Sequence, residues 1–269
     1  MTKIINRNCP VCGNGNENGQ NLVYGPPEWP MIECFSCGMV YLKKAPDPAE
    51  LFENLAWEKS SIVENTRREK EHGLTRKISK ATRWRLHVFT RKSIEGITQK
   101  YAKPGRIVDL GCGDGSHLSR LADGYSPYGI EVSKNLALQA EKNLASKNGK
   151  VTNADALTGL RNLPENQFTG VMMRSFLEHD IDPKNTLLEA HRVLESGGIV
   201  VIKVPNYGCI NRIYRGKKWC GFRFPDHVNY FTPGTLRKLL TECGFTIIRD
   251  NFLDHLPTSD NMWLVARKT

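Results

Sequence analysis

Long apolar runs are absent from this sequence. No stretch approaches the roughly 20 apolar residues that a membrane-spanning helix needs, and the first nine residues lack the apolar core of a secretory signal. These absences exclude a predicted membrane span and a predicted signal, so we expect a cytoplasmic protein. Internal repeats and low-complexity tracts are also missing. The apolar fraction of 39% and the charged fraction of 25% are typical of a soluble globular protein.

Acidic residues are scarce relative to basic ones, and the formal net charge is +10. The excess is concentrated between Lys59 and Lys103, where thirteen Lys or Arg residues stand against four Glu residues. Such a segment could bind an anionic partner. It could equally be the solvated face of helices, and the sequence slightly favours this second interpretation.

The eight cysteines do not form the pattern of a disulfide framework, because four of them make two C-x-x-C pairs near the N-terminus. The pairs are Cys9 with Cys12 and Cys34 with Cys37, each followed by a glycine and separated by 21 residues. Four thiolates satisfy tetrahedral Zn²⁺ and leave no position open, so we predict a structural zinc ion. A redox dithiol is the alternative, but no β-α-β pattern surrounds either pair.

The chain divides into three parts by composition. A zinc-binding ribbon is predicted over 1–45, with short strands around 22–24, 31–34 and 39–42. A linker and basic helices follow over 46–103, where apolar residues recur at helical spacing between 61 and 101. The remainder, 104–269, alternates apolar strands with amphipathic helices.

This alternation predicts a parallel, doubly wound α/β sheet. Ser133, Asp182 and Thr232 are expected to cap helices, the last two before Pro183 and Pro233. The predicted strands are 106–110, 127–131, 149–152, 168–173 and 197–204, with a terminal pair at 245–249 and 262–266. The predicted helices are 115–123, 133–146, 183–194 and one that opens at Thr232 and closes at Gly244.

The segment 106–115 organises this region: a short apolar strand breaks at Gly111, Gly113 and Gly115 and then leads into a helical pattern. Glycines let a backbone approach a ligand closely and adopt positive φ. The N-terminus of a following helix offers free N–H groups to a polar ligand. Strand, glycine turn and helix together predict a nucleotide-binding crossover.

Three acidic residues come at or near strand ends in the crossover region: Asp109, Glu131 and Asp155. Ligands of doubly wound sheets bind at the carboxyl ends of the strands. A nicotinamide dinucleotide fold is the rival interpretation. Ser116 stands where that fingerprint has its third glycine, which counts against the dinucleotide. Asp109 places a negative charge beside the loop, which disfavours a pyrophosphate and suits a ligand with an amino group or one without phosphates.

The stretch VDLGCGDG at 108–115 resembles motif I of class I S-adenosylmethionine-dependent methyltransferases. Four further segments resemble, in the same order, the ribose motif, the adenine motif, the fourth strand with its active-site loop, and the fifth strand with its preceding helix: 129–133, 153–157, 168–179 and 192–202. The resemblance implies a seven-stranded Rossmann-like sheet. It also implies that the 111–115 loop, with Cys112, binds the methionine part, Glu131 the ribose, and Asp155 with Ala156 the adenine. Asp109 lies beside the loop, and Arg174 ends the fourth strand next to the methyl group.

The segment 226–236 is similar to one in ubiquinone-methylase-like and sugar-methyltransferase-like enzymes, some of which carry a four-cysteine zinc module. The large extra C-terminal domain of sugar C-methyltransferases of this kind is not seen, which argues against C-methylation. The acceptor would be a sugar, a polysaccharide end or a quinone-like ring. In-line methyl transfer needs a positioned acceptor and a base for its proton.

Two histidines are candidates for that base. His179 follows Glu178 after the fourth strand, and His227 lies in a lid predicted over 205–232, which is rich in aromatic and basic residues. Either imidazole suits proton abstraction from a hydroxyl, and either could instead only fix a loop. Glu178 and His179 could also bind a divalent ion, but two ligands are too few to define a site.

Three functions therefore compete. The first is O-methylation of a small-molecule or glycan acceptor. The second is RNA methylation that uses the zinc ribbon and the basic helices, although neither an N-P-P-Y-like motif nor a pair of catalytic cysteines is present. The third is a non-catalytic zinc-ribbon interaction protein. The acceptor and the oligomeric state do not follow from the sequence.

Overall fold

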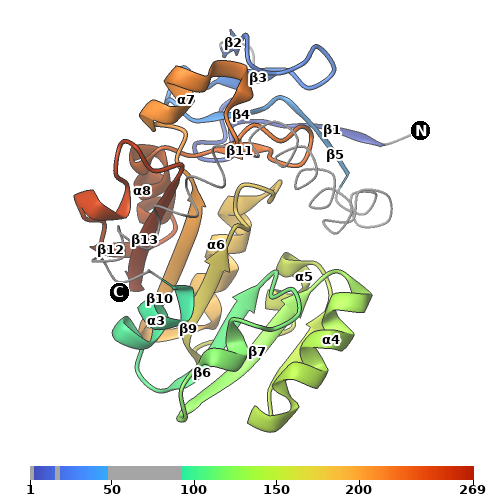
Figure 1. Ribbon diagram of the computed structural model, residues 1–269, viewed down its shortest axis with the longest axis vertical. Helices are drawn as coiled ribbons and strands as arrows, with labels where there is room; N and C mark the ends of the chain where they lie inside the picture. The colour runs from blue at the N-terminus through green and yellow to red at the C-terminus, as the bar shows by residue number, and fades with distance from the viewer. Residues whose placement is uncertain (1–2, 16–18, 48–92) are drawn as a thin grey trace, which may run out of the picture.

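The computed structural model describes residues 3–15, 19–47 and 93–269 (Figure 1). The helices predicted over 61–92, and with them most of the basic segment 59–103, lie outside the described residues. None of the described helices is long and apolar enough to cross a membrane.

A seven-stranded sheet forms the centre of the molecule, in the order β12-β13-β10-β9-β6-β7-β8. The five strands from β10 to β8 pair in parallel, whereas β13 is antiparallel to both of its neighbours. This confirms the predicted fold class and every predicted strand of the core. The strands are β6 (Gly105–Leu110), β7 (Tyr125–Glu131), β8 (Lys150–Asn153), β9 (Phe168–Arg174), β10 (Leu194–Pro205), β12 (Phe245–Arg249) and β13 (Asn261–Lys268).

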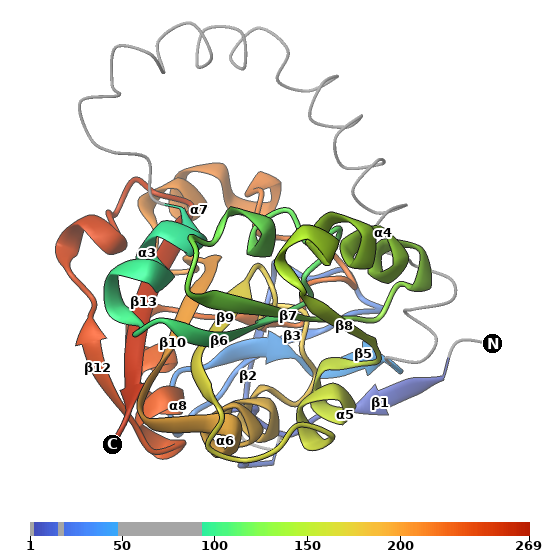
Figure 2. The ribbon, with the colours of Figure 1, turned by 90° about the horizontal axis from the view of Figure 1, so that it is seen from below.

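Helices cover both faces of this sheet (Figure 2). Apolar residues of α5, α6 and α8 share one buried cluster with the sheet, and those of α3 and α4 share another. Burial of these two stripes is the main force that holds the layers together. The helices are α3 (Ile94–Tyr101), α4 (Lys134–Leu144), α5 (Ala156–Arg161), α6 (Pro183–Val193) and α8 (Pro233–Glu242).

The predicted helix caps are confirmed. The side chains of Ser133, Asp182 and Thr232 accept hydrogen bonds from Leu136 N, Asn185 N and Thr235 N at the starts of α4, α6 and α8. Each bond satisfies a backbone donor that the first helical turn leaves free. Local sequence therefore sets where these helices begin.

The α-helix predicted over 115–123 is wrong. The chain forms only a 3₁₀ turn, Leu118–Arg120, before it becomes extended at Leu121. β7 begins at Tyr125, two residues before its predicted start, after Gly124 at φ +91°. In the described part of the chain, the glycine loop therefore does not lead directly into the N-terminus of an α-helix.

The N-terminal residues and the segment 205–232 share a second sheet (Figure 1). β11 (Asn229–Tyr230) pairs antiparallel with β4 (Val40–Leu42), and the order β11-β4-β3-β2 continues with β3 (Met31–Glu33) and β2 (Gln20–Leu22). β1 (Ile4–Asn6) and β5 (Lys44–Pro46) form a separate pair. The strands predicted near 31–34 and 39–42 are confirmed. The strand predicted over 22–24 is found two residues earlier, as β2.

An apolar cluster joins the two parts of this sheet. Met31, Val40 and Leu42 of the N-terminal module pack with Trp219 and Phe222 of the segment 205–232. Tyr207, Val228 and Tyr230 belong to the same cluster. Packing therefore accounts for much of the aromatic content of 205–232, whereas Tyr214, in α7 (Ile210–Arg215), is 90% exposed.

Candidate functional site

The glycine loop after β6 presents its backbone to open space. Gly111, Gly113 and Gly115 have φ of +68°, +59° and +76°, values that residues with a Cβ atom rarely adopt. A Cβ added at Gly113 would meet nothing within 4 Å. A Cβ at Gly111 would lie 3.3 Å from the ring of Phe176, in the loop after β9. A ligand can therefore approach the backbone of Gly113, and the glycine loop touches the loop after β9.

Glu131 ends β7 and fixes its carboxylate against this loop. Its Oε2 accepts a hydrogen bond of 2.8 Å from Gly113 N, and its Oε1 accepts one of 2.9 Å from Ser133 N. The side chain is buried, and each carboxylate oxygen has a second lone pair. Glu131 can thus hold the glycine loop and still accept from two neighbouring hydroxyl groups.

Asp109 is a buried carboxyl at the end of β6. Its Oδ1 has no hydrogen-bond partner among the described residues. Burial raises the pKa of Asp109 to about 8; the charge of Arg174 opposes this shift, and Glu131 and Glu95 add to it. A cationic group of a ligand would satisfy the free oxygen and restore the carboxylate. The ammonium group of S-adenosylmethionine fits this requirement.

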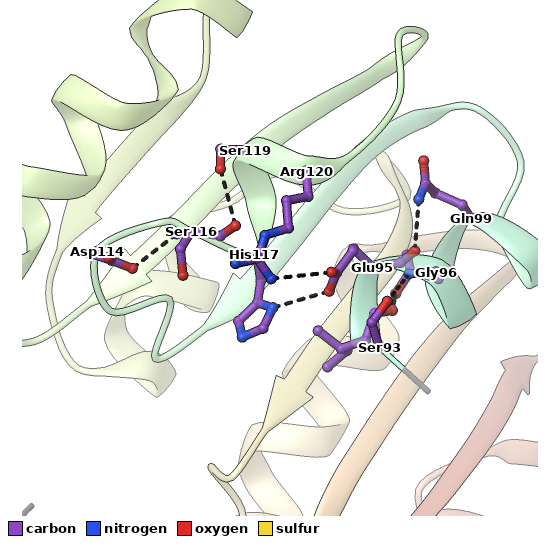
Figure 3. A network of polar contacts seen from close by, with 11 residues as sticks. Ser93, Glu95, Gly96, Gln99, Asp114, Ser116, His117, Ser119 and Arg120 are labelled. Carbon is purple, nitrogen blue, oxygen red and sulfur yellow. Dashed lines mark hydrogen bonds and ion pairs between the residues drawn. The ribbon is translucent and has the colours of Figure 1, made fainter. Parts of the chain in front are cut away.

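A polar network ties α3 to the segment after the glycine loop (Figure 3). His117 Nδ1 lies 3.1 Å from Glu95 Oε2, and Arg120 Nη1 lies 3.5 Å from Glu95 Oε1. Burial alone would raise the pKa of Glu95. Hydrogen bonds from its own amide and from His117 outweigh this effect, and the net pKa lies below its usual value. Sequence reasoning missed this network because no motif links residues that far apart in the chain.

Asp155 and Ala156 lie where β8 leads into α5. Asp155 is the N-cap of α5, and its Oδ1 accepts a hydrogen bond of 2.9 Å from Thr158 N. The Asn153 side chain donates to Glu131 O at 2.8 Å and so joins the ends of β7 and β8. The structure therefore brings both residues to the same sheet edge as Glu131, and their contact with adenine stays a prediction.

The predicted residues Cys112 and Arg174 have different surroundings. The Cys112 side chain is buried against the sheet, where its Sγ would lie 2.5 Å from a Cβ added at Gly129. Only the backbone of Cys112 can therefore face a ligand at the loop. Arg174 is exposed at the end of β9, and its charge acts on Asp109.

The two candidate bases, His179 and His227, lie in direct contact, with ring centroids 4.6 Å apart and the planes at 85°. His179 Nδ1 lies 3.2 Å from Asp226 Oδ1 and 2.9 Å from Asp226 O. His227 Nδ1 donates to Gly221 O at 2.8 Å. The structure thus joins the loop after β9 to the segment 205–232 through this pair.

The two histidines differ in the direction in which their pKa is shifted. Burial lowers the pKa of His179, but the hydrogen bond and the charge of Asp226 outweigh it and raise that pKa above its usual value. Burial and the neighbouring His179 lower the pKa of His227 well below its usual value. Burial would raise the pKa of Asp226, but His179 holds it at about 2. His179 is therefore the stronger base, and His227 stays neutral.

The four paired cysteines gather as predicted. Cys9 Sγ lies 3.4 Å from Cys37 Sγ, and Cys12 Sγ lies 3.6 Å from Cys34 Sγ. All four sulfurs lie within 4.8 Å of one another, and none is in a disulfide. Sulfurs at the corners of a zinc tetrahedron are about 3.8 Å apart, given Zn–S bonds of about 2.3 Å. The four sulfurs fit this ion.

Comparison with known proteins places the chain in a family. The family described as "Methyltransferase domain" matches residues 83–250, more than half of the chain. The chain belongs to this family. It carries a methyltransferase domain, as the order of its motifs predicts, and this family supports S-adenosylmethionine as the methyl donor.

Individual relatives add little on the acceptor. An uncharacterised 37.1 kDa protein of a Streptomyces fradiae transposon is 32% identical over 121 residues, which are 42% of this chain and 34% of that protein. The chain thus matches about a third of the length of this relative. That protein has no described activity that could point to an acceptor for the methyltransferase.

Solved structures share the fold of this methyltransferase. A methyltransferase from Methanosarcina mazei aligns with a TM-score of 0.51 at 22% identity over 64% of this chain and 96% of its own. A chain from the complex of the Haloferax volcanii Trm112 methyltransferase activator with a methyltransferase aligns with a TM-score of 0.53 at 17% identity, over 70% of this chain and 92% of its own. At these identities the likeness concerns the fold alone.

Proposed function

We propose that this methyltransferase transfers the methyl group of S-adenosylmethionine to a hydroxyl oxygen of a small acceptor, such as a sugar, a polysaccharide end or a quinone-like ring. The observation that carries the proposal is the Asp226–His179 pair. It places an imidazole of raised pKa in the loop whose Phe176 adjoins the glycine loop.

The cofactor would lie along the carboxyl edge of the sheet. The 111–115 backbone and Asp109 would hold the methionine part, Glu131 the ribose hydroxyls, and Asp155 with Ala156 the adenine. Arg174 would border the methyl group. Three observations support this arrangement: the free Asp109 oxygen, the open space at Gly113 and the fixed Glu131 carboxylate.

For this reaction the protein needs only to position the acceptor hydroxyl against the methyl group and to remove the proton of that hydroxyl. As the acceptor oxygen forms its bond to the methyl carbon, the bond from that carbon to the sulfonium sulfur breaks in line with it. The acceptor proton passes to His179 Nε2, because Nδ1 faces Asp226. Asp226 orients the imidazole and stabilises its positive charge, as the third group of a catalytic triad does. His227 would pack against His179 and hold it in place.

Zinc would be structural in this proposal. Cys9, Cys12, Cys34 and Cys37 would hold it and so stabilise the module that pairs with β11. The ion would leave no position open for water. We therefore assign it no part in the transfer.

A screen for the acceptor tests the proposal directly. Cell extract is incubated with the protein and isotope-labelled S-adenosylmethionine, and the labelled product is identified by mass. We expect a labelled small molecule with an O-methyl group, and Asp226→Asn should lower turnover far more than cofactor affinity. Label in RNA, or on carbon or nitrogen, would contradict the proposal.

Neither alternative function has comparable support. The basic segment 59–103, which motivated RNA methylation, lies mostly outside the described residues. A non-catalytic role conflicts with the family match and with a site whose free Asp109 oxygen suits the cofactor.

A further inference from the structure

Two cationic side chains lie next to each other near the carboxyl ends of β9 and β10. Arg174 pairs with Lys203 in the parallel register, so their Cα atoms are about 4.8 Å apart. Neither side chain has an anionic partner among the described residues. We propose that Arg174 and Lys203 bind a carboxylate or a phosphate of the acceptor. This inference rests on the proposed function, and it narrows the acceptor to an anionic hydroxy compound.

The strand register places both cations on the face of the sheet that carries Asp109. Asp109 pairs with Met172 of β9, and Arg174 stands two residues after Met172. Side chains alternate between the two faces along a strand, and paired residues share a face. Burial raises the pKa of Asp109, and the charge of Arg174 opposes this rise. The cation pair thus adjoins the place proposed for the ammonium group of the cofactor.

The order of the strands separates the two sides of the site. In the sequence of neighbours β10-β9-β6-β7-β8, Asp109 ends the central strand β6. The ribose and the adenine are proposed to lie at β7 and β8, whereas Arg174 and Lys203 lie on the opposite side, on β9 and β10. β9 also leads into the loop that carries His179, the proposed base. Lys203 is one strand farther from the cofactor than Arg174, so a group held by both cations suits the acceptor.

Lys203 is a half-buried cation without a compensating charge. Its Nζ lies 5.9 Å from the centroid of the Trp263 ring, which has no net charge. Burial lowers the pKa of Lys203, the charge of Arg174 adds to this effect, and that of Glu178 opposes it without forming an ion pair. Like charges directly opposite on neighbouring strands are destabilising. A bound oxyanion would relieve this repulsion and compensate the half-buried charge.

The backbone after Arg174 fixes the pair. Ser175 has φ of +53°, a conformation that is uncommon for residues with a Cβ atom. Its N donates to Lys203 O at 2.8 Å, which ties the end of β9 to β10 beside both cations. Strained backbone of this kind persists where the surrounding structure holds it, and it is concentrated at ligand-binding and catalytic sites. The two cations are therefore carried by a backbone that the sheet itself holds.

The two side chains suit an oxyanion in complementary ways. A guanidinium group offers two parallel N–H donors to a carboxylate or a phosphate, and an ammonium group adds a point charge. Neutral sugars and neutral quinone-like rings would leave both charges without a partner. Among the acceptors proposed above, the pair favours those with an acidic group, such as an acidic sugar or a sugar phosphate.

The methyl-transfer screen tests this inference when a separation step is added. The small molecules of a cell extract are divided on an anion-exchange resin, and each fraction is incubated with the full-length protein and labelled S-adenosylmethionine. We expect labelled product from the retained, anionic fraction. Phosphatase treatment then distinguishes the two sources of charge, because a phosphorylated product loses its retention and a carboxylate product keeps it. Label from the unretained fraction alone would overturn the inference.

Variants of Lys203 show whether the cations act on the acceptor. Lys203→Gln should raise the KM for the retained acceptor by about tenfold or more, since a charge-assisted hydrogen bond is lost. The Kd for S-adenosylmethionine should not change, and Lys203→Arg should keep most of the acceptor affinity. Lys150→Gln, at an exposed lysine that begins β8 at the opposite edge of the sheet, is the matched control and should behave as the wild type.

Thermal unfolding without acceptor shows whether each variant is folded, and Lys203→Gln should melt no lower than the wild type because it removes a repulsion. If Lys203→Gln raises the Kd for the cofactor instead of the KM, the cations bind the cofactor and the inference fails. If O-methyl label enters neutral acceptors alone, the proposed function stands and the inference fails. If the label enters nitrogen or carbon of an anionic acceptor whose KM Lys203→Gln raises, the anion site stands and the proposed function fails.

Discussion

At the scale of single residues, we expect Asp109 to couple proton binding to cofactor binding. Folding raises its pKa from 3.8 to about 8, so the cofactor-free folded protein holds a proton there at neutral pH. The folded state binds more protons than the unfolded state, and this group therefore destabilises the fold as pH rises from 3.8 towards 8.

We expect the affinity for S-adenosylmethionine to fall as pH drops below 8, by up to about tenfold per pH unit, because the ammonium group needs the ionised carboxylate. Calorimetric titrations between pH 6 and 8 measure this slope. Asp109→Asn should bind weakly with no such slope, and without cofactor its melting temperature should fall less than that of the wild type as pH rises. A wild-type affinity independent of pH would refute the assignment.

Glu131 carries the second prediction at this scale. Glu131→Ala removes the bonds to Gly113 N and Ser133 N and the proposed bonds to the ribose. We expect cofactor affinity to weaken well over tenfold, since hydrogen bonds to a charged group contribute about 1.5–3 kcal/mol each. Asp182→Asn is the matched control, because asparagine caps a helix as well as aspartate does and Asp182, the N-cap of α6, is not among the proposed cofactor residues. Equal losses in both variants would show that Glu131 has no special role.

At the scale of elements, α8 depends on its first turn. Thr232 and Thr235 form a reciprocal capping box there, and the helix buries Leu236, Leu239 and Leu240 against the sheet. Thr232→Ala should lower the free energy of unfolding by about 1 kcal/mol, and Thr232→Ser by much less. Denaturant unfolding measures both. Cofactor affinity should not change, because α8 lies beyond the β6–β8 edge where the cofactor is proposed to bind.

Elements that depend on local sequence were predicted well. The core strands are apolar runs bounded by glycines and acids, and Ser133, Asp182 and Thr232 mark helix starts by their own hydrogen bonds. The helix after the glycine loop was not predicted correctly, because its apolar spacing is helical but the chain forms only a 3₁₀ turn and becomes extended at Leu121. Helical spacing of apolar residues alone does not distinguish these two outcomes.

Features that depend on distant residues could not be predicted. Nothing in the sequence pairs Glu95 with His117, β4 with β11, or His179 with His227. The glycines, acids and cysteines of the candidate site were recognisable because each belongs to a short motif with a fixed spacing. Contacts between motifs are set by the three-dimensional packing of the whole chain.

At the scale of the whole molecule, the four-cysteine module and the segment 205–232 act as one unit. Arg7, in the N-terminal module, donates to Val228 O at 2.9 Å, to Ile181 O at 3.2 Å and to Asn229 Oδ1 at 2.7 Å. It thereby joins β11 to the loop that carries His179. Loss of the proposed zinc ion should therefore disturb the acceptor side of the site more than the cofactor side.

Removal of zinc by a chelator should lower the melting temperature and raise the KM for the acceptor, while the Kd for S-adenosylmethionine changes little. Cys12→Ser should act in the same direction. Re-addition of zinc to the chelated wild-type protein is the control and should restore the KM. If the Kd for the cofactor rises as much as the KM, the module does not act selectively on the acceptor side.

The pairing of β4 with β11 also has a consequence for how the chain folds. The paired residues Val40 and Tyr230 are far apart in sequence, whereas the strands from β6 to β9 connect through short crossovers. Contacts between distant segments are slow to form, because a long loop must close first. We expect the cofactor half of the sheet to assemble early, with the histidine pair among the last contacts completed.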